Sequence, residues 1–440
     1  MAALTALPTA SIHGAAPVQD DPATVAHVLN RLTFGPRAGD VDRAREMGLQ
    51  AWVDRQLHPE KIDDGAVDAR LLPLASAPDS AEPKELRRFA RRQVVTLGAN
   101  KIVREVYSER QLQEVLVDFW FNHFNVYAGK GRTAQFLPEY ESDVIRPHVL
   151  GRFRDLLEAT AKSPAMLMYL DNWRSTAPDA IRGARLGLRA QNAKRPRGLN
   201  ENYGRELLEL HTLGVNGGYT QQDVVEVARA FTGWTIDRAG QFRFVRAVHD
   251  RGDVVVLGHR IAAGGIEQGE RVLDILASHP STAHHIAFAL AQQLVSDDPS
   301  PALVDRAAAR FTATNGDLRE VVRTIVTAPE FLAPATRGAK FKTPLEFVVS
   351  ALRATGADVH DGRPFVQALQ ELGEPPFMCQ PPTGYRNTAE TWVSAGGLVN
   401  RMNLATRLTS GAMRVVTLPD GAGDPEALAL RLGSPEFQRR

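Results

Sequence analysis

The chain has 440 residues, of which 43% are hydrophobic and 23% are charged. This length is enough for one large domain or two ordinary domains, and the composition excludes collagen-like, mucin-like and wholly disordered proteins. Lys and Arg number 52 against 51 Asp and Glu, so the formal charge of +1 gives no reason to expect a nucleic-acid partner. The single cysteine, Cys379, excludes an intrachain disulfide and a Cys-rich metal site.

The N-terminal sequence, MAALTALPTASIHGAAPVQDD, has neither a basic region nor a continuous apolar stretch. A signal peptide is therefore not predicted, and a cytoplasmic location is the expectation. Residues 1–21 are predicted to form a weakly ordered tail. No run of about 18 apolar residues occurs anywhere, so no membrane-spanning helix is expected.

Helical patterns dominate the rest of the chain. They cover 22–34, 38–58, 84–127, 152–170, 200–213, 220–232, 266–278, 281–296, 301–313, 317–327, 344–354, 363–372 and 390–408. Strand signals concentrate in 240–261, which we interpret as one hairpin around an Asp-Arg-Gly-Asp turn. The sequence thus predicts a mostly α protein, a large irregular multi-helix domain over 22–410 with one small inserted β-hairpin, followed by a C-terminal tail or short helix over 411–440.

Residues 174–199 carry seven Arg or Lys and one Asp, a local charge of +6. Because few large apolar residues are available to order this stretch, it is predicted to be a mobile surface loop. A lid or a contact for an anionic polymer is the functional alternative.

The stretch 111–127 (QLQEVLVDFWFNHFNVY) places Trp120 and His123 on one aromatic helical stripe, whereas Asp118, Asn122 and Asn125 share a polar side. His123 has two interpretations at this point. It is either a buried core histidine with satisfied hydrogen bonds or a functional imidazole held by aromatic neighbours.

The stretch 200–214 (NENYGRELLELHTLG) is the most informative. At about 100° per residue, Asn202, Glu206 and Glu209 share one arc, with Tyr203 on the adjacent apolar arc. His211 lies about 140–160° from both glutamates by the same periodicity, which excludes a metal held by Glu206 and His211 of this helix. The paired carboxylates, with Arg205 beside Glu206, suit acid–base chemistry; an Arg–Glu network joining helices is the alternative.

His249 and Asp250 lie at the bend of the predicted hairpin, where they either orient a sugar hydroxyl or bind a metal, or serve only as turn polar groups. His279, His284 and His285 surround a helix start without the spacing of a known ligand signature. The sequence has no GxxxxGK[ST], GxGxxG or GxSxG motif, so no nucleotide or flavin cofactor is predicted. No feature of the sequence indicates a bound metal.

Several of these segments together resemble a large, mostly bacterial family, the domain of unknown function 1800. The segments that carry the resemblance are 27–35 (HVLNRLTFG), 118–124 (DFWFNHF), 169–172 (YLDN), 200–214, 218–221 (GYTQ), 230–234 (AFTGW), 249–250, 340–344 (KFKTP), Trp392 and 400–401 (NR). Phe121 stands where the usual family pattern has a histidine, so the resemblance implies no second histidine on that helix. It implies a mostly helical fold. It also implies export, which many relatives share, and a sulfatase-like partner encoded nearby.

Two functions follow as hypotheses. The first is a hydrolase or lyase acting on a polar polymer such as a polysaccharide, with Glu206 or Glu209 as acid or base and His123 or His211 assisting. The substrate-binding residues would be Trp120, Asn122, Asn202, Tyr203, Arg205, His249 and Asp250. The second is a non-catalytic helical scaffold or binding module. This assignment of the site requires these side chains to line one open cavity.

Overall fold

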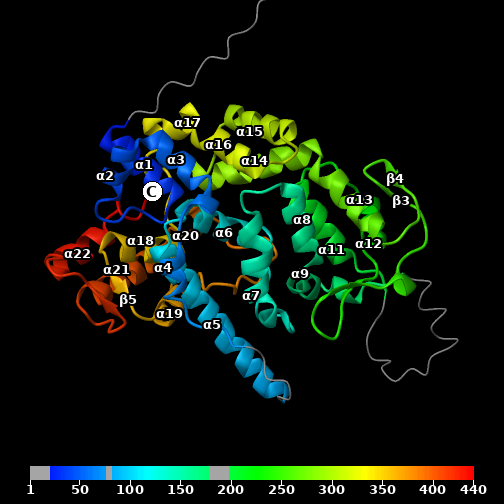
Figure 1. Ribbon diagram of the computed structural model, residues 1–440, viewed down its shortest axis with the longest axis horizontal. Helices are drawn as coiled ribbons and strands as arrows, with labels where there is room; N and C mark the ends of the chain where they lie inside the picture. The colour runs from blue at the N-terminus through cyan, green and yellow to red at the C-terminus, as the bar shows by residue number, and fades with distance from the viewer. Residues whose placement is uncertain (1–19, 76–81, 178–197) are drawn as a thin grey trace, which may run out of the picture.

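The computed structural model describes residues 20–75, 82–177 and 198–440, and most of these residues lie in helices (Figure 1). In chain order the α-helices are α1 (Pro22–Leu32), α2 (Asp40–Met47), α3 (Leu49–Gln56), α4 (Gly65–Asp68), α5 (Pro83–Tyr107), α6 (Gln111–His123), α7 (Leu137–Glu139), α8 (Phe153–Lys162), α9 (Pro164–Tyr169), α11 (Glu201–Glu206), α12 (Gln221–Ala230), α13 (Ile266–Ala277), α14 (Pro280–Leu294), α15 (Pro301–Ala313), α16 (Leu318–Val326), α17 (Pro329–Leu332), α18 (Pro344–Ala354), α19 (Arg363–Glu371), α20 (Ala389–Trp392), α21 (Ala395–Thr409) and α22 (Pro425–Gly433). Shorter 3₁₀ turns and two π-helical segments, Tyr140–Ile145 and η6 (Leu207–Thr212), connect them.

Helix starts follow the capping chemistry of the sequence. Asp21 accepts hydrogen bonds from the first turn of α1, and Thr220 and Thr343 form capping boxes at α12 and α18. These side chains satisfy backbone N–H groups that a helix start leaves without partners. Residues 84–127 are not one helix, because α5 ends at Tyr107 and α6 begins at Gln111.

The strands form three small antiparallel pairs: β1 (Trp234–Ile236) with β2 (Phe242–Phe244), β3 (Val254–Val256) with β4 (His259–Ile261), and β5 (Asp358–Val359) with β6 (Val416–Thr417). The mostly helical fold class with small β-hairpins is confirmed. The prediction of a single hairpin over 240–261 was wrong in its strand pairing. β2 pairs with the preceding β1, and β3 pairs with the following β4. Leu257 and Gly258, both with positive φ, form the tight turn that joins β3 to β4.

Two hydrophobic cores meet at α6. The larger core contains Leu112, Leu116 and Trp120 of this helix, and the second contains Val115. In Figure 1, α14, α15 and α16 lie at one side of α6, whereas α18, α21 and α22 lie at another. A helix shared by two cores is held from both sides, which fixes the position of the polar side chains it carries.

The C-terminal residues pack back onto the body of the molecule. Helix α22 lies against α21, and Lys340 and Arg440 exchange backbone hydrogen bonds. Residues 1–19 of the predicted tail and 178–197 of the predicted basic loop lie outside the described residues. Among the residues described, no helix is both long and apolar enough to cross a bilayer.

Candidate functional site

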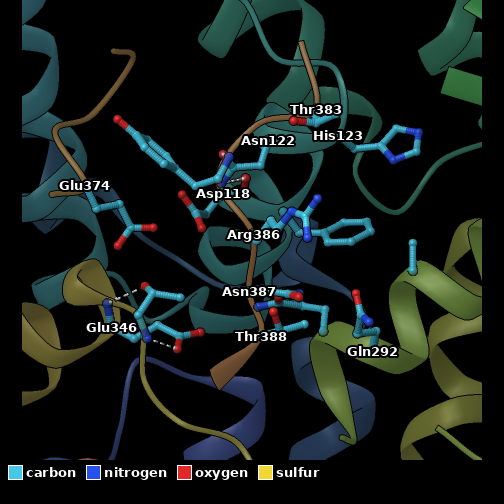
Figure 2. Close-up of a pocket in the computed structure, with 15 residues that line it drawn as sticks. Asp118, Asn122, His123, Gln292, Glu346, Glu374, Thr383, Arg386, Asn387 and Thr388 are labelled. Atoms are coloured by element: carbon cyan, nitrogen blue, oxygen red, sulfur yellow. Dashed lines mark hydrogen bonds between the residues drawn. The ribbon is translucent and has the colours of Figure 1, made fainter. Parts of the chain in front are cut away.

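A cavity of about 310 Å³ opens where α6, α14, the start of α18 and the segment 383–388 meet (Figure 2). Its lining combines carboxyl groups with amides, hydroxyls and one imidazole. The lining residues are Asp118, Phe119, Asn122, His123, Ala289, Gln292, Gln293, Thr343, Glu346, Glu374, Thr383, Tyr385, Arg386, Asn387 and Thr388. A cavity of this volume with convergent polar groups is typical of a ligand site.

The segment 383–388 closes over the C-terminal end of α6. The Asn122 side chain accepts a hydrogen bond from the backbone N–H of Tyr385 (3.1 Å) and donates one to the carbonyl oxygen of Asp118 (3.2 Å). Gly384 has a φ of 68°, and a Cβ at this position would overlap the backbone oxygen of Asn122. Only glycine permits both the backbone conformation and this close approach.

Asp118 is held by a buried lysine. The Nζ atom of Lys101 lies 2.8 Å from Asp118 Oδ1 and 2.7 Å from Glu105 Oε1. Burial of Lys101 favours the neutral amine, but the carboxylates of Asp118 and Glu105 together hold its pKa above the ordinary range. The Lys101 ammonium group thus forms ion pairs with both carboxyl groups.

Glu374 presents the opposite case. Its side chain is buried, and its Oε2 atom accepts the backbone N–H of Leu345 at 2.7 Å, in the first turn of α18. Burial raises the pKa of Glu374 to about 8, and the charge of Asp118 acts in the same direction. Glu374 is therefore mainly protonated at neutral pH. Figure 2 shows the carboxyl groups of Asp118 and Glu374 directed into the same space.

A smaller cavity of about 20 Å³ adjoins these two carboxyl groups. Its polar lining residues are Lys101, Asp118, Asn122, Asn125, Glu374 and Tyr385. A space of this volume with several polar groups around it is large enough for one water molecule. Phe121 also lines it, with its ring edge-on to the rings of Tyr140 and Phe377.

The third carboxyl group of the large cavity, Glu346, is committed to structure. It completes the capping box of α18 with Thr343, and its Oε1 lies 2.6 Å from Arg440 Nη2. Arg386, by contrast, is exposed at the cavity, and its guanidinium group has no ion-pair or hydrogen-bond partner within the described part of the chain.

Of the sequence-predicted residues, Asn122 and His123 line this cavity. The Nε2 atom of His123 donates to the carbonyl oxygen of His211 (3.1 Å), because a carbonyl can only accept. Nδ1 is then the unprotonated ring nitrogen. Burial, together with His285 and His211, lowers the pKa of His123 well below its ordinary value, and burial lowers that of His211 to about 3. Both rings are neutral at physiological pH.

The predicted carboxylate pair lies elsewhere. Neither Glu206 nor Glu209 lines the cavity, and both are half-buried. Burial raises the pKa of Glu206, with Glu209 adding to the rise and Arg205 opposing it. Glu209 accepts a hydrogen bond from the Tyr219 hydroxyl (2.9 Å). The backbone widens to a π-helix at Leu207, so the 100° periodicity used for Glu209 and His211 does not hold there.

The other residues near this pair do not line the cavity either. Arg205 donates to the Gln221 side chain (2.9 Å) rather than to Glu206, which differs from the Arg–Glu network considered as the alternative. Asn202 is exposed, and Tyr203 is buried against Phe231.

Trp120, His249 and Asp250 belong to other surroundings. Trp120 is fully buried, and its indole N–H donates to the carbonyl of Val149 (3.2 Å). His249 donates from Nδ1 to the carbonyl of Thr232 (2.8 Å), and Asp250 pairs with Arg229 (2.9 Å). None of the three lines the cavity of about 310 Å³.

No group of three or more His, Cys, Asp or Glu within residues 20–75, 82–177 and 198–440 has the arrangement of a metal site. Glu374 and Lys101 were not among the site residues predicted from the sequence. Asp118 was predicted on the polar side of its helix, but without a functional role. The available signal for Lys101 was a lysine four residues before Glu105, a spacing that places the two side chains on one face of a helix.

The comparisons assign a family but no activity. The chain belongs to the family of proteins of unknown function DUF1800, whose model matches residues 27–439. No curated protein and no solved structure matches the chain.

Proposed function

We propose that this member of the DUF1800 family is a hydrolase or lyase that acts on a polar polymer such as a polysaccharide, with Asp118 and Glu374 as its acid–base pair. The observation that carries the proposal is the contrast between two carboxyl groups on one cavity. Asp118 forms an ion pair with Lys101, whereas burial keeps the proton on Glu374. Carboxyl groups whose environments separate their proton affinities divide acid and base roles.

In hydrolysis, Asp118 takes a proton from a water molecule as the water oxygen attacks the substrate carbon. Glu374 gives its proton to the leaving oxygen, so the bond to that oxygen breaks without releasing a free alkoxide. In elimination, Asp118 takes a carbon-bound proton instead, and Glu374 again protonates the leaving oxygen. The small cavity beside both groups offers a place for the water molecule.

The remaining lining suits a hydroxyl-rich substrate. Asn122, Gln292, Asn387 and Thr388 offer amide and hydroxyl groups, and Nδ1 of His123 is free to accept a hydrogen bond. Arg386 at the exposed side provides a charged donor for an acidic group, such as a carboxylate or sulfate on the polymer. A sulfatase-like partner, encoded nearby, would act on the same class of substrate.

The test is a screen of acidic and neutral polysaccharides for new reducing ends or unsaturated products. Glu374→Gln removes the acidic proton but keeps the shape, and Asp118→Asn removes the base. Each variant should lose about 10²-fold or more of turnover. Glu46→Gln changes an exposed glutamate of α2 and should retain full activity.

Unchanged turnover in Glu374→Gln and Asp118→Asn would contradict the assignment of the pair. Substrate binding with no product in the wild type would instead favour the binding module.

A further inference from the structure

A second cavity, of about 520 Å³, is bordered by Lys342 in the segment that leads into α18. It is formed by the connection between α1 and α2, by α18 and by the residues that follow α22. Its charged lining residues are Arg37, Lys342, Arg431, Glu436 and Arg439. Four cationic side chains thus face one carboxylate, although Glu109 lies 4.0 Å from Arg37.

Lys342 is the central observation. Its side chain is only 4% exposed, and its ammonium group has no hydrogen-bond or ion-pair partner in the part of the chain that the structure describes. The Nζ atom lies 3.8 Å from the centre of the Phe437 ring, a contact that favours the charged form. A buried cation without a counter-charge is costly, and proteins rarely retain one without a partner.

The charges around Lys342 do not supply that partner. Glu346 attracts it but lies beyond ion-pair distance and is itself paired with Arg440 at 2.6 Å. Arg440 and Arg401 repel it. Burial is the largest influence, and it lowers the pKa of Lys342 to about 7.

The start of helix α2 faces the same cavity. Its N-cap is Gly39, which has no side chain to cap the first turn, although that turn carries Asp40 and Asp42. The N–H of Asp40 donates to the carbonyl of Arg37 (3.1 Å), and both Gly39 and Val41 line the space. The N-terminus of a helix attracts negative charge through its free N–H groups and its dipole.

We propose that this cavity binds a small organic anion, with its phosphate or carboxylate group at Lys342 and its apolar part against Phe437, Val41 and Ala354. The volume is sufficient for a ligand of this size. The site is separate from the Asp118–Glu374 pair, and it does not depend on the proposed reaction.

Calorimetric titration of the full chain tests this. The probes are phenyl phosphate and benzoate, with benzyl alcohol as the neutral match, and the comparison of the two anions shows which oxyanion the site prefers. One anion should bind saturably, and Lys342→Met should weaken it by about tenfold to a hundredfold, the value of a hydrogen bond to a charged group. Lys84→Met on an exposed face of α5 should bind as the wild type does, and so should Asp118→Asn.

Three results would overturn the proposal: no saturable binding of either anion, equal binding of benzyl alcohol, or equal binding by Lys342→Met. If Lys342→Met does not fold, the comparison of the two anions with benzyl alcohol on the wild-type protein tests the proposal. Because binding requires the ammonium form, benzoate affinity should fall by up to about tenfold per pH unit above pH 7. A flat profile between pH 7 and 9 would equally reject the site.

Discussion

Burial and several neighbouring groups set the proton affinity of the Glu374 carboxyl group. The surrounding side chains exclude water, and Asp118 adds a like charge. Hydrogen bonds from the N–H of Leu345 and from the Thr343 side chain favour the ionised form. The first two dominate, so the pKa of Glu374 is about 8 in the folded protein against 4.5 for an ordinary glutamate. This single residue therefore links the chemistry of the cavity to the stability of the fold.

The link gives a pH-dependent prediction. Between pH 4.5 and 8 the folded protein keeps a proton on Glu374 that the unfolded chain releases, so the contribution of Glu374 to stability is complete below pH 4.5 and is lost as the pH rises to 8. The loss is at most about 1.4 kcal/mol per pH unit. Glu374→Gln removes it, so the melting temperature of the variant relative to wild type should increase from pH 5 to pH 8. A constant difference across this range would show that Glu374 is not protonated in the fold.

Gly384 makes a second prediction at the scale of one residue. Gly384→Ala should displace the segment 383–388 from α6, because the new methyl group meets the backbone of Asn122 and the positive φ costs about 1–3 kcal/mol. Turnover and melting temperature should both fall. Gly396→Ala is the matched control, since a Cβ there meets nothing within 4 Å, and its stability should change by no more than about 1 kcal/mol. Equal behaviour of the two variants would contradict the role of this glycine.

At the scale of elements, α6 positions the site because one of its sides packs into a core and the other faces the cavity. One side packs Leu116 and Trp120 into the larger core, and the other presents Asp118 and Asn122 to the cavity. The long helix α5 runs beside it and supplies Lys101. The pair of helices thus places a cation behind the acidic wall of the cavity.

The contact between α5 and α6 predicts a large effect on stability. Lys101→Met leaves the carboxylates of Asp118 and Glu105 without their cation, and breaking a buried ion pair from one side costs about 3–5 kcal/mol. Arg407→Met breaks an exposed pair with Glu371 and should cost about 1 kcal/mol or less. Urea unfolding of both variants measures the difference. Similar midpoints for the two would mean that Lys101 is not the counter-charge of this helix pair.

Elements with a local cause were predictable from the sequence, and those that depend on distant contacts were not. The polar side of α6 and the caps at Asp21 and Thr220 follow from spacing and side-chain chemistry. The π-helical turn after Glu206 does not, because its hydrogen bonds depart from the helix period assumed for the wheel. Glu374 meets Leu345 and Asp118, which are far away in the chain, so its neighbours give no local pattern.

At the scale of the whole molecule, the cavity lies at the boundary between the two hydrophobic cores. Its walls come from α14 on the larger core and from α18 on the second, with α6 in both. Three imidazoles lie near this boundary: the buried His211 on η6 and the half-buried His123 on α6 and His285 on α14. The His123 and His285 rings lie 5.9 Å apart, and Nε2 of His285 bonds to the carbonyl of Leu210 (3.2 Å).

These histidines make the assembly of the cores sensitive to acid. Burial is the largest cause that lowers the pKa of all three. His285 also lowers the pKa of His123 and of His211, and the exposed His284 lowers that of His285. Because the unfolded chain binds protons near pH 6.5 and the fold does not, their contribution is complete above pH 6.5 and is lost as the pH falls. The loss is at most about 4 kcal/mol per pH unit for three groups.

Thermal unfolding between pH 7 and 4.5 measures this loss. His285→Asn removes one of the three groups, so the melting temperature of this variant should fall less steeply with acid than that of the wild type. His284→Asn changes the neighbouring, exposed histidine, whose charge acts on His285, and should change the slope less than His285→Asn does. If His285→Asn keeps the wild-type slope, or if His284→Asn flattens it equally, acid acts on the fold elsewhere than at the boundary between its two cores.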